Sequence, residues 1–175
     1  GHSPMIADSD YARYLKYYGE IARKAISSSE DHNLYIAIRE LSDIKENPNT
    51  SNQDIKNAED NLNNALQSIS YISEAAYLGR INWWTVEYGL IGDIHNPKIY
   101  GAGLLSSIGE SENCLKGNVK KIPLSIDCIN FNYDITEQQP QLFIAEDFKS
   151  LNKILDDFSS KMAYKIGGLT GVEKA

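Results

Sequence analysis

The 175-residue chain is long enough for one domain with its own hydrophobic core, and it carries a net charge of −7 with a pI near 5.0. Nucleic-acid surfaces need clustered Lys and Arg, so this acidic composition argues against one. No apolar run approaches the roughly 20 residues of a membrane helix, and the two cysteines lie outside any CxxC spacing, which suits a reducing compartment. We therefore expect one cytoplasmic domain without a membrane or nucleic-acid partner.

The amino-terminal segment GHSPMIAD has no initiator Met, which indicates a piece of a longer chain. Its His2, taken alone, is compatible with a terminal residue that has no role. Apolar and aromatic side chains then recur at helical spacing up to residue 25. This pattern predicts a helix with Asp8 or Ser9 as its N-cap.

A polar helical hairpin is predicted over residues 27–73. Its first helix should stop before Pro48, because the residue preceding a proline is excluded from the helical region. Thr50, with Gln53 three residues later, predicts the cap of the second helix. We expect His32 in an exposed loop rather than in a metal site. The segment shows no catalytic constellation, so we interpret it as a solvated packing or contact element.

A third helix is predicted over residues 73–91, where helical spacing puts the apolar Trp83, Trp84 and Leu90 around one carboxylate, Glu87. A strand would place Glu87 on a more polar side, but the turn signals that should precede a strand are missing. The helix therefore predicts a buried acid.

A buried Glu87 needs a partner, because an isolated charge is costly to remove from water. Arg80 could supply a structural ion pair, and a bound metal is the alternative. Spacing alone leaves these two interpretations about even.

Short β-branched and aromatic runs separated by Gly, Pro and Asn predict loops and short strands over residues 98–147. Helical spacing returns over residues 148–166, with Ser150 as a possible cap. The predicted fold class is therefore mainly α with a small β component.

The stretch YGAGLLSSIGE, residues 100–110, contains two glycines separated by one residue, a spacing that allows close backbone approach. As a dinucleotide fingerprint it fails, because the sixth position is Ser106 rather than Gly and no clear strand and helix flank it. A phosphate-binding enzyme is thus a weak interpretation. Taken alone, the stretch is typical of a tight turn packed against the core.

Three segments together, WWTVEYGL, YGAGLLSSIGE and DITEQQPQLFIAEDF, resemble the pterin-dependent aromatic amino acid hydroxylases. They are similar to that family's iron-ligand helix, its substrate loop, and the strand and helix start that follow. The resemblance covers residues 1–25 and about 77–158. It implies the family's catalytic-domain fold, incomplete at the amino terminus, as a single domain over residues 1–175. Residues 27–73 would be an insertion of the kind found in long bacterial members.

The resemblance also implies a site for Fe(II). In the family, the metal is held by a His-Glu-x-x-Gly-His motif and a distant Glu. Gly1-His2 is similar to the end of that motif, so His2 and Glu87 are the implied ligands, and the first histidine would lie upstream of Gly1. The other implied sites are a substrate site at Trp83, Tyr88, Gly103 and Ser106 and a tetrahydrobiopterin site at Gly79 and Asn82.

The function implied by the resemblance is that of a monooxygenase. It would use Fe(II), tetrahydrobiopterin or a related reduced pterin, and dioxygen to hydroxylate an aromatic amino acid, with phenylalanine to tyrosine as the first expectation. Without the first histidine, this chain alone should bind iron weakly and be inactive. The alternative is a non-catalytic helical interaction module derived from the family. No heptad pattern marks the carboxyl end, so no tetramerisation helix is expected, and the oligomeric state is left open.

Overall fold

The computed structural model describes residues 6–135 and 137–174. The chain forms two compact units, and each is considered by itself: Ile26–Ala76 forms one, and the chain up to Ala25 together with the chain from Tyr77 onward forms the other. The prediction of a single domain with an insertion stays a prediction. Within the described residues, no helix is both long enough and apolar enough to cross a bilayer.

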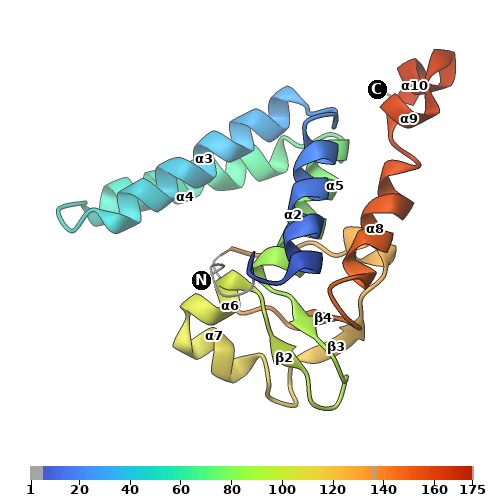
Figure 1. The fold of residues 1–175 in the computed structure, drawn as a ribbon. Coiled ribbons are helices and arrows are strands. Elements are labelled where there is room, and N and C mark those ends of the chain that lie inside the picture. The colour runs from blue at the N-terminus through green and yellow to red at the C-terminus, as the bar shows by residue number, and fades with distance from the viewer. Residues whose placement is uncertain (1–5, 136, 175) are drawn as a thin grey trace. The chain divides into compact units, whose positions relative to one another are not determined.

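The larger unit packs helices around a small sheet (Figure 1). The α2 helix and α8 lie side by side, joined by the Tyr17 hydroxyl, which donates to the Asp156 carboxylate at 2.7 Å. The helical elements are α2 (Ser9–Ala22), α5 (Glu74–Asn82), the π-helix η1 (Trp83–Glu87), α6 (Ala102–Ser106), α7 (Ile108–Asn113), the 3₁₀ helix η2 (Ile126–Asn130), α8 (Ser150–Ser159), α9 (Ala163–Ile166) and α10 (Gly168–Lys174).

The sheet has four short strands in the order β2-β1-β4-β3. Its strands are β1 (Leu90–Ile91), β2 (Lys98–Ile99), β3 (Lys120–Pro123) and β4 (Gln141–Ala145). The central β4 is parallel to both neighbours and is the most buried strand, as expected for a parallel strand covered on both faces. Together with the helices, the sheet confirms the predicted fold class, mainly α with a small β component.

The smaller unit is the predicted helical hairpin, built from α3 (Ser29–Glu46) and α4 (Asn52–Gln67). Its buried contacts are few, involving Ala37, Leu41, Ala58 and Leu62. Each helix begins with a reciprocal capping box, in which a serine side chain and a carboxylate three residues later satisfy each other's backbone N–H. Local signals therefore specify most of this unit.

Two details of the hairpin differ from the prediction. The cap of α4 is Ser51 with Asp54, one residue after the predicted Thr50 and Gln53. The reason is that the Thr50 hydroxyl is engaged elsewhere, donating to the Ile44 carbonyl at 2.9 Å. His32 is exposed as predicted, but it lies in the first turn of α3 rather than in a loop.

The predicted third helix ends earlier than its periodicity suggested. Regular α-helix stops at Asn82, a π-helix follows, and the last predicted helical residues, Leu90 and Ile91, form β1. The Gly89 carbonyl accepts from the N–H groups of Tyr100 and Gly101 at 3.2 and 3.0 Å, so pairing with the following strand ends the helix.

The segments on either side of β3 also differ from the prediction. Residues 102–113, expected as loop and strand, form the short helices α6 and α7, and residues 126–130 form a 3₁₀ helix. The last predicted helix breaks after Ser159 and resumes at Ala163. Of its two candidate caps at the amino terminus, α2 uses Asp8, whose carboxylate accepts from Asp10 and Tyr11.

Candidate functional site

The π-helix carries the candidate ligand Glu87 as its last residue. Its closing bond runs from the Tyr88 N–H to the Trp83 carbonyl at 2.8 Å, five residues back rather than four. The wider turn rotates the residues that follow relative to a 3.6-residue period, so Glu87 is half-buried instead of buried as predicted. Such π-turns are frequent at functional sites, where they re-aim one side chain.

The glycine-rich loop lies directly against the backbone of this π-helix. A Cβ on Gly101 would come within 2.5 Å of the Glu87 carbonyl oxygen and 2.6 Å of the Gly89 nitrogen. A Cβ on Gly103 would lie 2.8 Å from the Tyr88 ring and 3.0 Å from the Glu87 carbonyl oxygen. At Gly101 a real Cβ essentially never comes that close to backbone, and at Gly103 the Tyr88 ring would have to shift, so the two glycines allow the loop to approach Glu87 closely.

Three aromatic rings stack beside the carboxylate. The Trp83 indole lies 4.6 Å from the Tyr88 ring at 15° and 4.3 Å from the Tyr133 ring at 10°. The Tyr88 and Tyr133 rings are nearly parallel to the indole, and at these distances both cannot fit on the same indole face. They therefore cover opposite faces of Trp83. The Trp83 Nε1 is buried, with no hydrogen-bond acceptor among the described residues. Trp83 is therefore held between two rings, and its Nε1 is a buried donor without an acceptor among the described residues.

Two phenols that interact with Glu87 have raised pKa values. Burial and then the negative charge of Glu87 raise the pKa of Tyr11 to about 12. Burial and then the charges of Glu110 and Glu87 raise the pKa of Tyr88. Burial also raises the pKa of Glu110. These phenols are thus neutral at ordinary pH and can act only as hydrogen-bond donors or acceptors.

The structure brings together Glu87, Tyr88 and Gly103, and it stacks Trp83 on Tyr88. Ser106 lies at the carboxyl end of α6, exposed, and its hydroxyl donates to the Gly103 carbonyl at 2.9 Å. His2, the other predicted ligand, lies outside the described residues.

The predicted pterin residues, Gly79 and Asn82, lie on α5 and are half-buried. A Cβ on Gly79 would meet nothing nearer than the Tyr133 hydroxyl at 4.0 Å, so there is room beside it. The Arg80 guanidinium, the ion-pair partner considered for Glu87, donates to the Ile129 carbonyl at 2.7 Å and to Asn132 Oδ1 at 2.9 Å.

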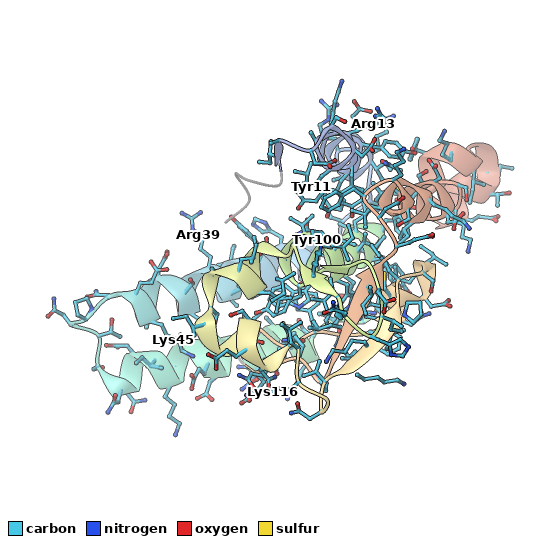
Figure 2. The ribbon with its side chains drawn as sticks, turned by 60° about the horizontal axis from the view of Figure 1, so that its bottom comes forward. Tyr11, Arg13, Arg39, Lys45, Tyr100 and Lys116 are labelled. Atoms are coloured by element: carbon cyan, nitrogen blue, oxygen red, sulfur yellow. The ribbon has the colours of Figure 1, made fainter. Side chains whose placement is uncertain are left out.

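Several residues around Trp83 and Tyr11 come from distant segments and were not identifiable from the sequence. Tyr133 stacks on Trp83 from a stretch predicted as strand or loop, and Tyr11 and Tyr100 meet edge to face at 5.7 Å (Figure 2). Helical spacing placed Tyr11 on the apolar face of its helix but could not identify the residue that it packs against. For Tyr133 the sequence offered no signal, because stacking across the fold has no local period.

Metal binding by the described residues alone is not supported, since residues 6–135 and 137–174 contain no group of three His, Cys, Asp or Glu side chains that could hold an ion. Glu87 nevertheless suits a ligand: it is a carboxylate, half-buried, at the end of a π-turn and beside a loop of small residues. A complete site would need donors from elsewhere.

Comparison with known families gives one match of substantial length. The model for the family described as biopterin-dependent aromatic amino acid hydroxylase matches residues 63–167, more than half of the chain.

Individual relatives are consistent with this match. The chain is 40% identical over 84 residues to human phenylalanine-4-hydroxylase, covering 47% of this chain and 19% of that protein. It is 40% identical over 160 residues to the enzyme of the same name from Dictyostelium discoideum, covering 91% of this chain and 26% of that protein. The chain thus spans about a quarter or less of the length of these relatives.

A solved structure shares the fold. A variant of phenylalanine hydroxylase from Chromobacterium violaceum superposes with a TM-score of 0.54 at 25% identity, covering 90% of this chain and 42% of that one. The fold of the described chain is therefore that of an aromatic amino acid hydroxylase catalytic domain, in part.

Proposed function

Because the chain belongs to the biopterin-dependent aromatic amino acid hydroxylases, we propose that it is the carboxyl-terminal part of the catalytic domain of an iron- and tetrahydropterin-dependent monooxygenase. Its substrates would be dioxygen and an aromatic amino acid, with phenylalanine hydroxylated to tyrosine. The similarity to proteins named phenylalanine-4-hydroxylase supports this choice of substrate. The two buried, unpaired thiols of Cys114 and Cys128 suit the cytoplasmic location that belongs to the same proposal.

The observation that carries the proposal is the close approach of the glycine-rich loop to the Glu87 backbone. A carboxylate and a loop of small residues are brought into contact from segments separated by β1 and β2. A side chain at Gly101 would collide with backbone, and one at Gly103 would displace the Tyr88 ring, so glycine at both positions keeps the contact close. This arrangement places a potential ligand beside a potential substrate loop.

Iron would be held by Glu87 and His2, together with a histidine supplied from upstream. Carboxylate oxygen and imidazole nitrogen form the donor set suited to non-haem Fe(II). Bound iron and reduced pterin would supply the activation of dioxygen.

The remaining residues would bind and orient the organic ligands. Gly103 lies against Tyr88 and the Glu87 carbonyl, Ser106 donates to the Gly103 carbonyl, and Trp83 is fixed between two rings. The space beside Gly79, on the same helix as Asn82, would take the pterin. A substrate ring could stack on Trp83 only by displacing Tyr88 or Tyr133.

Ferrous iron titration tests the ligand assignment. The protein extended upstream through the His-Glu-x-x-Gly-His motif should bind one equivalent of Fe(II) and convert phenylalanine to tyrosine when tetrahydrobiopterin is supplied. Glu87→Ala should abolish both, because a two-histidine site loses chelation and charge balance. The matched control is Glu112→Ala on α7, which removes an exposed carboxylate and should leave both unchanged. Equal iron binding by Glu87→Ala and the parent would overturn the assignment.

The alternative is a non-catalytic interaction module derived from the family, although the relative from Dictyostelium discoideum aligns over 91% of this chain and so takes in most of the hairpin. The family match begins at residue 63, inside α4, so most of the hairpin lies outside it. Failure of the extended parent protein to bind iron, with its fold intact, would favour this alternative.

A further inference from the structure

A buried chain of hydrogen bonds connects α2 to the π-helix. The Tyr14 side chain is fully buried, and its hydroxyl lies 2.8 Å from the Thr85 hydroxyl. Thr85, in the middle of the π-helix and two residues before Glu87, is also fully buried. The Thr85 hydroxyl in turn donates to the Ile81 carbonyl at 2.6 Å.

The direction of the Tyr14–Thr85 bond follows from counting protons. Thr85 has one hydroxyl proton, and the Ile81 carbonyl, which can only accept, takes it. Tyr14 must therefore be the donor to Thr85. Burial raises the pKa of the Tyr14 phenol well above its usual range, so the donor keeps its proton at any accessible pH.

The bond is not a general consequence of burial. The hydroxyls of Tyr11 and Tyr100 are buried to the same degree, yet neither has a hydrogen-bond partner among the described residues. Figure 2 shows these two side chains converging from α2 and from the start of the glycine-rich loop. Of the two fully buried α2 tyrosines, Tyr11 and Tyr14, Tyr14 is the one bonded to the π-helix.

A π-turn needs such support because its hydrogen-bond geometry is rarely favoured and it persists only where tertiary contacts specify it. The threonine bond to the carbonyl four residues back is a known means of bending a helix. Here the bond spans the junction between regular α-helix, ending at Asn82, and the π-helix. By donating to the Thr85 hydroxyl oxygen, Tyr14 holds the Thr85 side chain in one rotamer.

We propose that Tyr14 is a positioning residue, which acts through Thr85 to hold the π-turn and so aims the Glu87 carboxylate. The inference deepens the proposed function and rests on it, since Glu87 is there the iron ligand. Tyr14 touches neither metal nor substrate in this proposal. Its contribution is to connect α2, the helix that follows the His2 segment, to the element that carries the second implied ligand.

Hydrogen exchange in the metal-free, upstream-extended protein tests the structural step. Tyr14→Phe should make the amides of residues 84–88 exchange about tenfold faster, because it removes one buried hydrogen bond from the junction. Tyr17→Phe is the matched control: it is the same chemical change on the same helix, but its hydroxyl bonds to Asp156 on α8. It should leave these amides unchanged.

Two substitutions at Thr85 keep the test decisive if Tyr14→Phe does not fold. Thr85→Ser retains the hydroxyl and should exchange like the parent, whereas Thr85→Val keeps the shape, removes both bonds and should exchange at least tenfold faster. A double variant Tyr14→Phe with Thr85→Val should be no worse than Thr85→Val alone, because the two act as one unit.

Fe(II) affinity then separates this inference from the proposed function. If the parent binds iron, Tyr14→Phe and Thr85→Val should bind it about tenfold more weakly, while Tyr17→Phe and Thr85→Ser should match the parent. Unchanged exchange at residues 84–88 in Tyr14→Phe, or in Thr85→Val where Tyr14→Phe does not fold, overturns the inference whether or not iron binds. Faster exchange with undiminished iron affinity overturns it as well. Absence of iron binding by the folded parent overturns the proposed function, and with it the role of Tyr14 in orienting Glu87 as an iron ligand.

Discussion

The hairpin of α3 and α4 and the site around the π-helix are held together in opposite ways. In the hairpin, each helix starts with its own capping box, and four buried side chains join the two helices. At the site, Glu87 takes its place through contacts with a loop that lies two strands later in the chain. One region is specified by neighbours in sequence, and the other by neighbours in space.

The two modes of stabilisation predict different effects of substitutions. Hairpin variants should change the stability of the hairpin and leave the site unaffected, because local hydrogen bonds and a small core specify it. Site variants should change the geometry of Glu87 even when they remove no hydrogen bond, since backbone contacts specify it. Four predictions test the contrast, from the largest expected effect to the smallest.

Gly101→Ala should have the largest effect of the four substitutions. The added Cβ would collide with backbone atoms of Glu87 and Gly89, which cannot move aside as a flexible side chain could. We expect about 3 kcal/mol of destabilisation or more, measured by urea unfolding. Gly117→Ala, where a Cβ would meet nothing within 4 Å, is the control and should stay within about 0.5 kcal/mol of the parent. Equal stabilities for the two variants would contradict the close contact.

Leu41→Ala should destabilise the hairpin and leave the site unchanged. Leu41 is 3% exposed, so truncation leaves a cavity that costs about 2 to 3 kcal/mol. Hydrogen exchange should accelerate across α3 and α4, with residues 84–88 unaffected. Leu66→Ala removes a side chain that is 47% exposed and should have a much smaller effect. Acceleration that spread to the π-helix would show that the two regions are not independent.

High pH should destabilise the larger unit because the Tyr11 phenol ionises. Its pKa is raised from 10.0 to about 12 in the folded chain, so between these values the folded state binds more protons than the unfolded state. The stabilisation is complete below pH 10 and is lost as pH rises toward 12, by about 1.4 kcal/mol per pH unit. Urea unfolding at pH 9 and 11 should show a smaller loss for Tyr11→Phe than for the parent. Tyr35→Phe, at an exposed position, should lose as much as the parent.

Ser51→Ala should cost about 1 kcal/mol, the usual effect of losing an N-cap. The Ser51 hydroxyl accepts from the Asp54 N–H and donates to the Asp54 carboxylate, so the variant removes both of these bonds and leaves the backbone half of the box, from the Ser51 N–H to the Asp54 carboxylate. Gln53→Ala, at the position that the sequence pattern favoured, should change stability by less than about 0.5 kcal/mol, because its side chain bonds only to Asn57 at the surface. If Gln53→Ala destabilised the protein more than Ser51→Ala, the predicted cap, Thr50 with Gln53, would be supported instead. Urea unfolding followed by circular dichroism measures both.

Much of the architecture could be predicted from sequence. Helical periodicity and end signals located α2, the hairpin and the start of α8 to within a few residues, because those signals act within one or two turns. From Trp83 onward, helical periodicity predicted a continued α-helix where the chain forms a π-helix and then β1. A 3.6-residue period cannot indicate a π-turn, and the strand β1 exists only because β2 and β4 pair with it.

The candidate site divides in the same way. The sequence indicated Glu87, Trp83 and the glycine pair, since each is chemically conspicuous among its neighbours. It could not indicate Tyr133, Tyr14 or Tyr100, ordinary tyrosines in a chain that contains 11 of them. Only their packing against Trp83, Thr85 and Tyr11 distinguishes them.

The sequence by itself determined the fold class, the hairpin and the identity of the conspicuous acid, because capping, periodicity and residue chemistry are local properties. The tertiary structure decided how Glu87 is exposed and what lies beside it. Backbone contact through Gly101 and Gly103, and the hydrogen bond from Tyr14 through Thr85, join segments far apart in the chain. Their strength depends on distances in space that no short stretch of sequence contains.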